Sequence, residues 1–448
     1  MSLASRVRAA EGNRLKVADE PLRGLGTLKA QVRSIVSMDD IALIARDNPL
    51  RARSELKRAC AQVFEDACWA LTGDAQREKL VQRFMDETFG MGPLEPLLAD
   101  DSITEIMING PNRIFYERDG KIFESDQMFA DIDQLRALID RILGPLGRRV
   151  DEASPLVNAR LPEGHRVHVA IPPLALEGPV VTIRKFSRGI ITLNEMHTSE
   201  TLEPEVVQLF IWAVLARKNL AVSGGTGSGK TTLLNALSAV VPATERIITI
   251  EDSAELRFLT HPHVVRLEAR PRNAEGFGEI TIRDLVINAL RMRPDRIIVG
   301  ECRAGEALDM LQAMTTGHDG SLTTLHANSP ADAVARLTTM VRYAVDLPVD
   351  VIESTIASAF DLVIQTSRAL DGRRYVSHIA QYRFDVEKRL CQTELLYERN
   401  SVQAQGCWYA EPVWIEEVVK KTCATRGEVK AWRQRISILQ ARLQARLA

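Results

Sequence analysis

One glycine-rich stretch sets the architecture of this chain, and it reads Gly224-Gly225-Thr226-Gly227-Ser228-Gly229-Lys230-Thr231. Its spacing is that of a Walker A phosphate loop, in which a lysine and a hydroxyl residue follow the last glycine. Apolar residues 220–222 precede it as a short strand, and residues 231–240 have helical character. A strand, a glycine loop and a helix in this order are the context in which the motif holds phosphate. The stretch therefore predicts an α/β nucleotide-binding domain.

The residues of this loop have separate expected roles. The glycines let the backbone close around a phosphate, so that several N–H groups point inward at a helix N-terminus. Lys230 is expected to reach the β- and γ-phosphates, and the Thr231 hydroxyl to ligate Mg²⁺. The alternative is an accidental glycine turn, which the flanking strand and helix disfavour. The predicted nucleotide contacts within the loop are Gly225, Thr226, Gly227, Ser228, Gly229, Lys230, Thr231 and Thr232.

Composition bounds the class of protein. The chain has 448 residues, and its 57 basic and 59 acidic side chains leave a net charge of −2. This length predicts two or three domains, and the charge balance offers no broad basic field, so no nucleic-acid partner is expected. No apolar run approaches the length of a membrane span, and residues 1–30 lack the apolar core of a signal peptide. We expect a cytoplasmic protein.

The cysteines predict neither disulfides nor zinc. They include no CxxC pair, which is typical of reduced, structural cysteines in a cytosolic protein. The set is Cys60, Cys68, Cys302, Cys391, Cys407 and Cys423.

Changes in residue composition and hydrophobic periodicity along the chain predict five regions. Residues 1–90 read as a charged arm with one or two short helices, followed by a helical hairpin that ends at the Gly90–Pro93 break. Residues 91–185 alternate like short strands with one helix, which predicts an α+β domain. Residues 186–201 are polar and read as a hinge, and residues 202–390 form the phosphate-loop domain. Residues 391–448 form an extension whose basic helix carries an apolar stripe, expected to pack on its own domain or to self-associate rather than to bind a partner.

Two further strand candidates of the phosphate-loop domain end in carboxylates, as expected where a parallel sheet carries its site at the strand ends. After residues 246–250 come Glu251, Asp252 and Glu255, which could hold Mg²⁺ or orient water; the alternative is a solvated loop. Residues 296–300 lead to Glu301 in a Walker B pattern, with Gly300 where many such motifs carry an aspartate. Glu301 is expected to activate water, or else only to favour the dipole of the following helix.

A third strand candidate lies between two histidines, His318 and His326. A histidine at a strand end is usually a satisfied core residue. Because this strand is rich in serine and threonine and follows the Walker elements, we expect His326 to sense the γ-phosphate by hydrogen bonding. His318 is expected to link the site to a neighbouring element.

At this point the chain resembles a known superfamily. Four boxes occur in the order of the type II/type IV secretion and pilus ATPases: a Walker A, an aspartate box, a Walker B and a histidine box. Within that superfamily the chain is most similar to the Tad (Flp) pilus assembly ATPases, the CpaF group, and the resemblance covers about residues 50–385. The boxes are residues 224–232, 250–256, 293–303 and 316–329, and the CpaF-like stretches are residues 92–98, 159–167 and 182–186.

The resemblance implies a P-loop (RecA-like) domain with a mainly parallel sheet, preceded by a PAS-like α+β domain and a helical region. It also implies a homohexameric ATPase that uses ATP and Mg²⁺, with each nucleotide between the two domains of a subunit. Arginines of the first domain would reach the phosphates, and Arg160, Arg166 and Arg184 are the candidates by position; otherwise they face solvent. Arg303 is expected to pair with an acidic residue of the aspartate box.

The implied function is a motor for Tad/Flp-type pilus assembly or for type II/IV-like protein secretion. It would work at the cytoplasmic face of the inner membrane, attached peripherally through a platform protein. Two alternatives stay open: a nucleic-acid translocase of a conjugation-like system and a non-hydrolysing nucleotide-gated scaffold. Two departures limit the resemblance. The paired CxxC zinc motif of other branches is missing, and no family pattern is evident beyond about Arg389.

Overall fold

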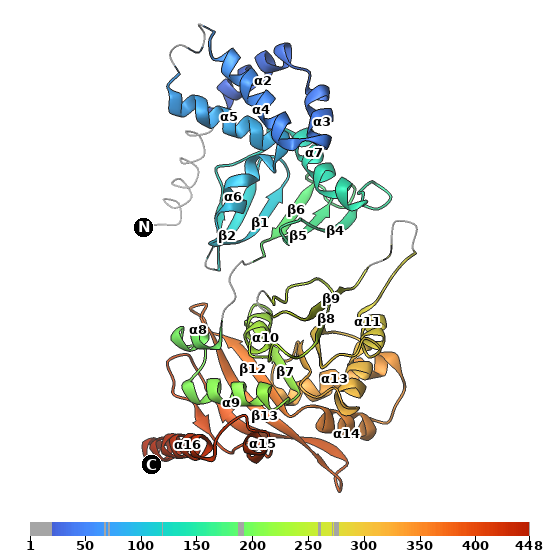
Figure 1. Ribbon diagram of the computed structural model, residues 1–448, viewed down its shortest axis with the longest axis vertical. Helices are drawn as coiled ribbons and strands as arrows, with labels where there is room; N and C mark the ends of the chain where they lie inside the picture. The colour runs from blue at the N-terminus through green and yellow to red at the C-terminus, as the bar shows by residue number, and fades with distance from the viewer. Residues whose placement is uncertain are drawn as a thin grey trace, which may run out of the picture. The chain divides into compact units, whose positions relative to one another are not determined.

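The computed structural model describes residues 20–66, 69, 72–118, 120–186, 192–258, 261–270, 272 and 277–447. The chain divides into two compact units, Met1–Arg188 and Gly189–Ala448 (Figure 1). Residues 187–191 of the expected hinge lie outside the described residues, and residues 193–198 of it form a helix that packs on the second unit. None of the helices described is both long and apolar enough to span a bilayer.

The first unit begins with a helical bundle. It comprises α2 (Glu20–Ile35), α3 (Met38–Asp47), α4 (Pro49–Val63) and α5 (Asp74–Phe89). Leu28, Leu56 and Phe84 come from three of these helices and are almost completely buried in one core. Residues 20–47, expected as part of an arm, therefore pack with the predicted hairpin.

The α+β part of the first unit is a six-stranded sheet with the order β3-β2-β1-β6-β5-β4. All of its strand pairs are antiparallel. Helix α7 (Ile132–Leu143) places Leu135, Leu138 and Ile139 in the core that this sheet forms. The short helices η2 (Gly92–Leu94), α6 (Glu95–Ala99) and η3 (Gly144–Leu146) complete it. The strands are β1 (Ile103–Asn109), β2 (Ile114–Arg118), β3 (Lys121–Glu124), β4 (Leu156–Arg160), β5 (Arg166–Ala170) and β6 (Val180–Arg184).

The second unit is built on a nine-stranded sheet with the order β15-β14-β13-β12-β7-β11-β10-β8-β9. The six strands from β12 to β9 run parallel, and β13, β14 and β15 add antiparallel strands at one side. The strands are β7 (Leu220–Gly224), β8 (Ile247–Glu251), β9 (Val264–Glu268), β10 (Arg296–Cys302), β11 (Leu322–Leu325), β12 (Leu362–Arg368), β13 (Arg374–Asp385), β14 (Leu390–Glu398) and β15 (Cys407–Trp408).

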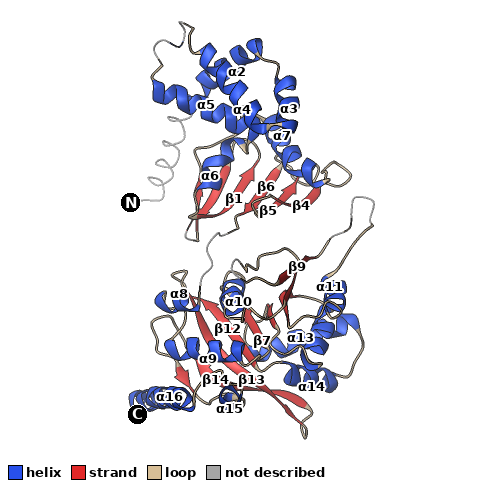
Figure 2. Cartoon of the chain, in the orientation of Figure 1, coloured by secondary structure: helices blue, strands red, loops and turns tan. Residues whose placement is uncertain are grey.

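Helices cover both faces of this sheet, as Figure 2 shows. Side chains of a strand alternate between faces. Accordingly Leu220 and Val222 of β7 join one hydrophobic cluster, whereas Ala221 joins the other. The helices are α8 (Leu193–Thr198), α9 (Pro204–Leu215), α10 (Lys230–Ser238), α11 (Ile282–Ala289), α12 (Glu306–Thr315), α13 (Pro330–Ala344), α14 (Val349–Ala359), α15 (Ile415–Lys420) and α16 (Arg426–Leu447).

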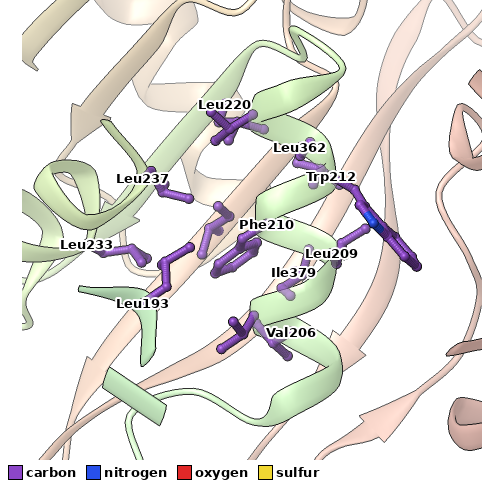
Figure 3. Close-up of a cluster of buried hydrophobic side chains, with 14 of the residues drawn as sticks. Leu193, Val206, Leu209, Phe210, Trp212, Leu220, Leu233, Leu237, Leu362 and Ile379 are labelled. Atoms are coloured by element: carbon purple, nitrogen blue, oxygen red, sulfur yellow. The ribbon is translucent and has the colours of Figure 1, made fainter. Parts of the chain in front are cut away.

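Helix α9 is apolar on most of its surface because it is sandwiched within this core. Figure 3 shows Phe210 and Leu209 of α9 beside Leu220 and Leu362 of the central strands. The predicted fold class is confirmed: the second unit is an α/β P-loop (RecA-like) domain with a mainly parallel sheet, and an α+β region and a helical region precede it.

The C-terminal residues pack on this same domain, as the apolar stripe predicted. Val429, Trp432 and Ile436 of α16 are buried in the core that α9 also enters. The Trp432 ring meets the Trp408 ring edge-on at 5.1 Å, and its indole N–H donates to the Glu205 carbonyl at 2.9 Å. The division that the sequence suggests at residue 390 falls where β14 begins, inside the sheet.

Candidate nucleotide site

The parallel strands bring the motif residues to one edge of the sheet. Strands β7, β8, β10 and β11 all run the same way, so their carboxyl ends meet at that edge. The phosphate loop follows β7, Glu251 ends β8, Glu301 lies near the end of β10, and His326 follows β11. Four stretches separated by up to about a hundred residues thus converge.

The phosphate loop has the backbone conformation that its glycines permit. Gly224, Gly227 and Gly229 have φ angles of 154°, 71° and 95°, a region that favours glycine. A Cβ atom on Gly224 would lie 2.5 Å from Thr366 Oγ1. Ser228 Oγ lies 2.7 Å from the same threonine oxygen, so β12 packs directly on the loop. The loop then opens α10 at its N-terminus, where backbone N–H groups favour an anion.

Lys230 lies folded back on the loop. Its Nζ donates to the Gly225 carbonyl at 2.9 Å and to the Gly224 carbonyl at 3.1 Å. Burial lowers the pKa of Lys230, and the nearby Glu301 carboxylate opposes that change. A buried ammonium bonded only to carbonyls and an imidazole gains from an anion. Lys230 therefore fits a phosphate ligand.

A chain of polar contacts runs from Lys230 to the acidic residues. His326 Nδ1 lies 3.4 Å from Lys230 Nζ, and His326 Nε2 lies 2.8 Å from Glu301 Oε1. An ammonium can only donate, so Nδ1 must accept from Lys230; Glu301 Oε1 is close to Nε2 but accepts no hydrogen bond among the described residues. Burial and then the Lys230 charge lower the pKa of His326, whereas Glu301 raises it. A neutral His326 thus connects the lysine to the carboxylate.

Arg303 continues this chain of contacts. Its Nη2 donates to Glu301 Oε2 at 2.6 Å, and its Nη1 lies 3.4 Å from Asp252 Oδ2. The expected pairing of Arg303 with the aspartate box is confirmed. Glu301 is therefore held by the Arg303 guanidinium on one oxygen and lies close to His326 with the other, at the mouth of the site.

Glu251 fills the space beside Gly300. A Cβ atom on Gly300 would lie 2.8 Å from Glu251 Cγ, so this glycine leaves room for a side chain from the neighbouring strand. Glu251 Oε2 accepts from the backbone N–H groups of Glu255 and Leu256, at 2.6 and 2.9 Å. Burial raises the pKa of Glu251, and those two hydrogen bonds oppose it. Glu251 Oε1 is buried and accepts no hydrogen bond among the described residues, so it fits a metal-bound water.

The remaining residues of the site are more open. Asp252 is 60% exposed, and its carboxylate faces Arg303. Glu255 follows in the loop that Glu251 holds, while Thr231 and Thr232 are half-buried in the first turn of α10. Mg²⁺ binds proteins through one or two carboxylates together with phosphate oxygens and water, and this open set of donors fits that habit.

Two arginines beside the phosphate loop escaped the sequence analysis. Arg374 Nε donates to the Gly227 carbonyl at 3.0 Å, and a Cβ atom on Gly227 would lie 3.5 Å from Arg368 Nη1. They are direct partners across the antiparallel pair β12–β13. Because the pairing of β12 with β13 cannot be read from either segment alone, no local motif would have revealed these two arginines.

The three candidate arginines of the first unit stand in one row. Arg160 of β4 pairs with Arg166 of β5, and Arg166 pairs with Arg184 of β6. Directly opposed residues of antiparallel strands point to the same face, and like charges in such positions are destabilising. Glu105 of β1, opposite Arg184, lies 3.8 Å from Arg184 Nε. The register thus brings the three candidate arginines together on one face of the sheet, with Glu105 beside Arg184.

His318 lies elsewhere. It precedes β11, whereas His326 follows it, so the two histidines belong to opposite edges of the sheet. The expectation that His318 links the phosphate site to a neighbouring element is wrong. The reason is geometric: a strand separates its two flanking residues by its full length.

Comparison with known proteins gives a consistent result. The family model described as Type II/IV secretion system protein matches residues 87–446. This match extends well past residue 389, so the C-terminal residues also carry the family pattern. A Mycobacterium tuberculosis (strain CDC 1551 / Oshkosh) protein, provisionally described as a conjugal transfer protein, is 36% identical over 76% of this chain and 94% of its own length. The type IV secretion system protein PtlH of Bordetella pertussis is 36% identical over 62% and 90%.

Among solved structures, the VirB11 ATPase of the Brucella suis type IV secretion system, in complex with sulphate, is 30% identical with a TM-score of 0.36. It covers 67% of this chain and 96% of its own. The pilus retraction motor PilT with bound ADP is 20% identical with a TM-score of 0.49, covering 63% and 80%.

Proposed function

Because the chain belongs to the type II/IV secretion system protein family, we propose that it is an ATP-hydrolysing motor that works as a homohexameric ring. One observation carries this proposal: the polar chain from Lys230 through His326 to Glu301, at the mouth of a phosphate loop. A site that only bound nucleotide would not need a carboxylate held beside the lysine. Glu301 is the group that would accept a proton from water or orient it.

In this proposal each residue has one task. The backbone of Gly225–Gly229 surrounds the phosphates, Lys230 leaves the loop carbonyls to contact them, and Thr232 lies nearest the α-phosphate. Thr231, Glu251 and Asp252 hold Mg²⁺ directly or through water, and Glu255 supports them. Mg²⁺ when bound would offset the charge that develops on the phosphate oxygens. His326 changes partner from Lys230 to the γ-phosphate and so reports its presence to Glu301.

The arginine row supplies the second half of the site in the proposal. Arg160, Arg166 and Arg184 would meet the phosphates when the first unit closes on a nucleotide, through charge-assisted fork contacts. Hydrolysis would release that contact and let the first units swing about residues 186–201. The physical basis is the alignment of three guanidinium groups on adjacent strands, which the several negative charges of a nucleotide's phosphates would complement.

We place the motor in a Tad/Flp-type pilus or a related secretion system, as the CpaF-like stretches in the first unit suggest. A polytopic platform protein would receive the motion and hold the ring at the cytoplasmic face of the inner membrane. The moving bodies would be the two compact units, Met1–Arg188 and Gly189–Ala448, because residues 391–447 are built into the sheet and core of the phosphate-loop domain. Neighbouring genes for a prepilin and a platform protein would support this assignment.

A second candidate, translocation of nucleic acid, gains support from the names of relatives. The protein TrbB of Rhizobium radiobacter, described as a conjugal transfer protein, is 34% identical over 64% of this chain and 86% of its own length. The net charge of −2 counts against it. Stimulation of ATP hydrolysis by DNA would favour translocation, and an unchanged rate would favour the pilus or secretion motor.

The chemistry is tested by Glu301→Gln, which keeps the shape of the side chain and removes its basicity. We expect ATP binding to persist and phosphate release to fall by about a hundredfold or more. Asp346→Asn serves as the control, because that carboxylate is 91% exposed and, among the described residues, pairs with Arg342 alone. Unchanged turnover in the Glu301 variant removes Glu301 from its role, and a wild-type chain that releases no phosphate favours the scaffold.

A further inference from the structure

The first unit contains a cavity of about 580 Å³ that the proposed motor function does not use. It lies between the helical bundle and α7, and residues of α2, α3, α5 and α7 line it. Small-molecule sites usually occupy roughly 300–1,000 Å³ and are mainly apolar with a few placed polar groups. The cavity has the size of such a site.

The lining is mainly apolar. Ile41, Phe84, Phe129 and Leu138 reach it and are themselves almost completely buried. Phe89 and two methionines, Met38 and Met91, also line it. Aromatic rings and flexible thioethers adapt to ligands of different outline, so these walls suit an apolar body.

The charged side chains of the lining favour an anion. Lys29, Arg33 and Arg141 are cationic, and Glu87 is the one acidic residue among those that line the cavity. The Glu87 carboxylate is already engaged by Lys29, and Arg83 Nε lies 3.9 Å from its other oxygen. One carboxylate therefore faces three cations, since Glu87 also acts electrostatically on Arg141, and the lining keeps an excess of positive charge.

Both arginines have guanidinium N–H groups that are available to an anionic ligand. Arg141 Nη1 donates to the carbonyls of Glu87 and Gly90 at the end of α5, but its Nε and Nη2 donate no hydrogen bond within the described part of the chain. Arg33 makes no ion pair or hydrogen bond with any described residue. Burial lowers the pKa of Arg141, and the Glu87 charge opposes that change. An anion would give both arginines a fork partner.

We propose that this cavity binds a small anionic amphiphile, whose apolar body lies among the phenylalanine and methionine side chains and whose carboxylate or phosphate contacts Arg33 and Arg141. Such a ligand would touch the helical bundle and α7 at once. Since it binds only the folded unit, it would stabilise the packing of the bundle on the α+β part. The cavity is then a regulatory site, separate from the phosphate loop.

The test uses the full chain with saturating ADP, so that the phosphate loop is occupied. Two probes, decanoate and 1-naphthyl phosphate, are titrated by calorimetry, and decanol serves as the uncharged analogue. Arg33→Gln removes a cation that supports no other contact, and Ala137→Phe fills the cavity from α7. Arg136→Gln is the matched control, because Arg136 precedes Ala137 in α7 and does not line the cavity.

We expect at least one anionic probe to bind, with an affinity reduced about tenfold or more by Arg33→Gln and abolished by Ala137→Phe. Arg136→Gln should bind as the wild type does, and decanol should bind more weakly than decanoate. The probe that binds more tightly shows whether the apolar part of the ligand is aliphatic or aromatic. If neither probe binds, or if both variants bind like the control, the proposal is wrong.

Discussion

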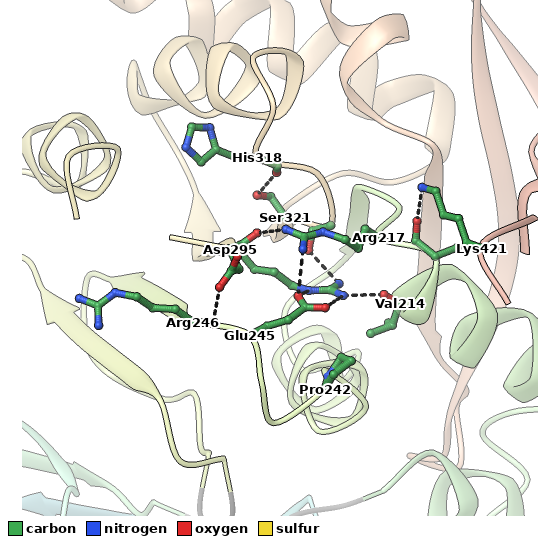
Figure 4. A network of polar contacts seen from close by, with 12 residues as sticks. Val214, Arg217, Pro242, Glu245, Arg246, Asp295, His318, Ser321 and Lys421 are labelled. Carbon is green, nitrogen blue, oxygen red and sulfur yellow. Dashed lines mark hydrogen bonds and ion pairs between the residues drawn. The ribbon is translucent and has the colours of Figure 1, made fainter. Parts of the chain in front are cut away.

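The two edges of the nine-stranded sheet are both rich in charge, yet they use it differently. At the amino edge the charges satisfy one another: the Arg296 side chain is fully buried and donates to both oxygens of Glu245, at 2.6 and 3.2 Å, and to the Val214 carbonyl. Figure 4 shows Glu245 and Arg217 pointing into this network. At the carboxyl edge, Lys230 donates to carbonyls of its own loop, which phosphate oxygens can replace.

This difference separates structural from functional charge in a way that residue type does not. Both edges contain a histidine, an arginine and carboxylates at strand ends. At the amino edge every bond of Arg296 closes on the protein, so a change there should affect folding. At the carboxyl edge the bonds are exchangeable, so a change there should affect turnover and leave folding almost intact.

The largest effect is expected for Arg296→Ala at the amino edge. It leaves Glu245 with Arg217 alone, 3.8 Å away, and removing the buried partner of such a pair costs about 3–5 kcal/mol of unfolding free energy. Urea unfolding followed by tryptophan fluorescence measures it, because Trp212, Trp408, Trp414 and Trp432 all belong to the second unit. Arg342→Ala, in an exposed pair with Asp346, is the control and should cost less than about 1 kcal/mol. If Arg296→Ala lost as little unfolding free energy as the control, the proposed difference between the two edges of the sheet would be wrong.

Lys230→Ala should produce the opposite pattern. Phosphate release should fall by about a hundredfold or more, since one preorganised donor to the developing charge is lost. The urea midpoint should move little, because burial already disfavours this ammonium, as the lowered pKa shows. A stability loss comparable with that of Arg296→Ala would show that Lys230 is structural.

Glu251→Gln is expected to have an intermediate effect. The amide oxygen can still accept from Glu255 and Leu256, so the loop should stay folded. The Mg²⁺ concentration for half-maximal ATP hydrolysis should rise about tenfold, because the free carboxylate oxygen is lost. An unaltered Mg²⁺ requirement would leave Glu251 as a clamp of the loop and nothing more.

The smallest effect concerns pH and His326. Its pKa is lowered in the folded chain, so the unfolded chain binds a proton first as the pH falls below about 6.5. Stability from this residue is therefore present above that pH and is lost as the pH drops further. His326→Gln should flatten the acid side of the unfolding midpoint plotted against pH. A wild-type profile with the same slope as the variant's would contradict it.

How much of this was visible in the sequence depended on how local the pattern was. The phosphate loop, the acidic strand ends and His326 could be predicted because each follows its own strand within a few residues. Strand β4 was missed, and so were Arg368 and Arg374, since their positions depend on pairing between strands. The same reason explains the error over His318: periodicity identifies a strand, but only its neighbours show which edge each end joins.

The arginine row has one more consequence. The backbones of Arg160, Arg166 and Arg184 belong to three adjacent strands of one sheet, so a movement of the first unit would carry all three toward or away from an anion together. On the proposed function, a polyvalent ligand would then gain or lose all three contacts in one step. Replacing one of the three arginines should then weaken the contacts of the other two. The loss of binding free energy in a double variant should therefore be smaller than the sum of the losses in the two single variants.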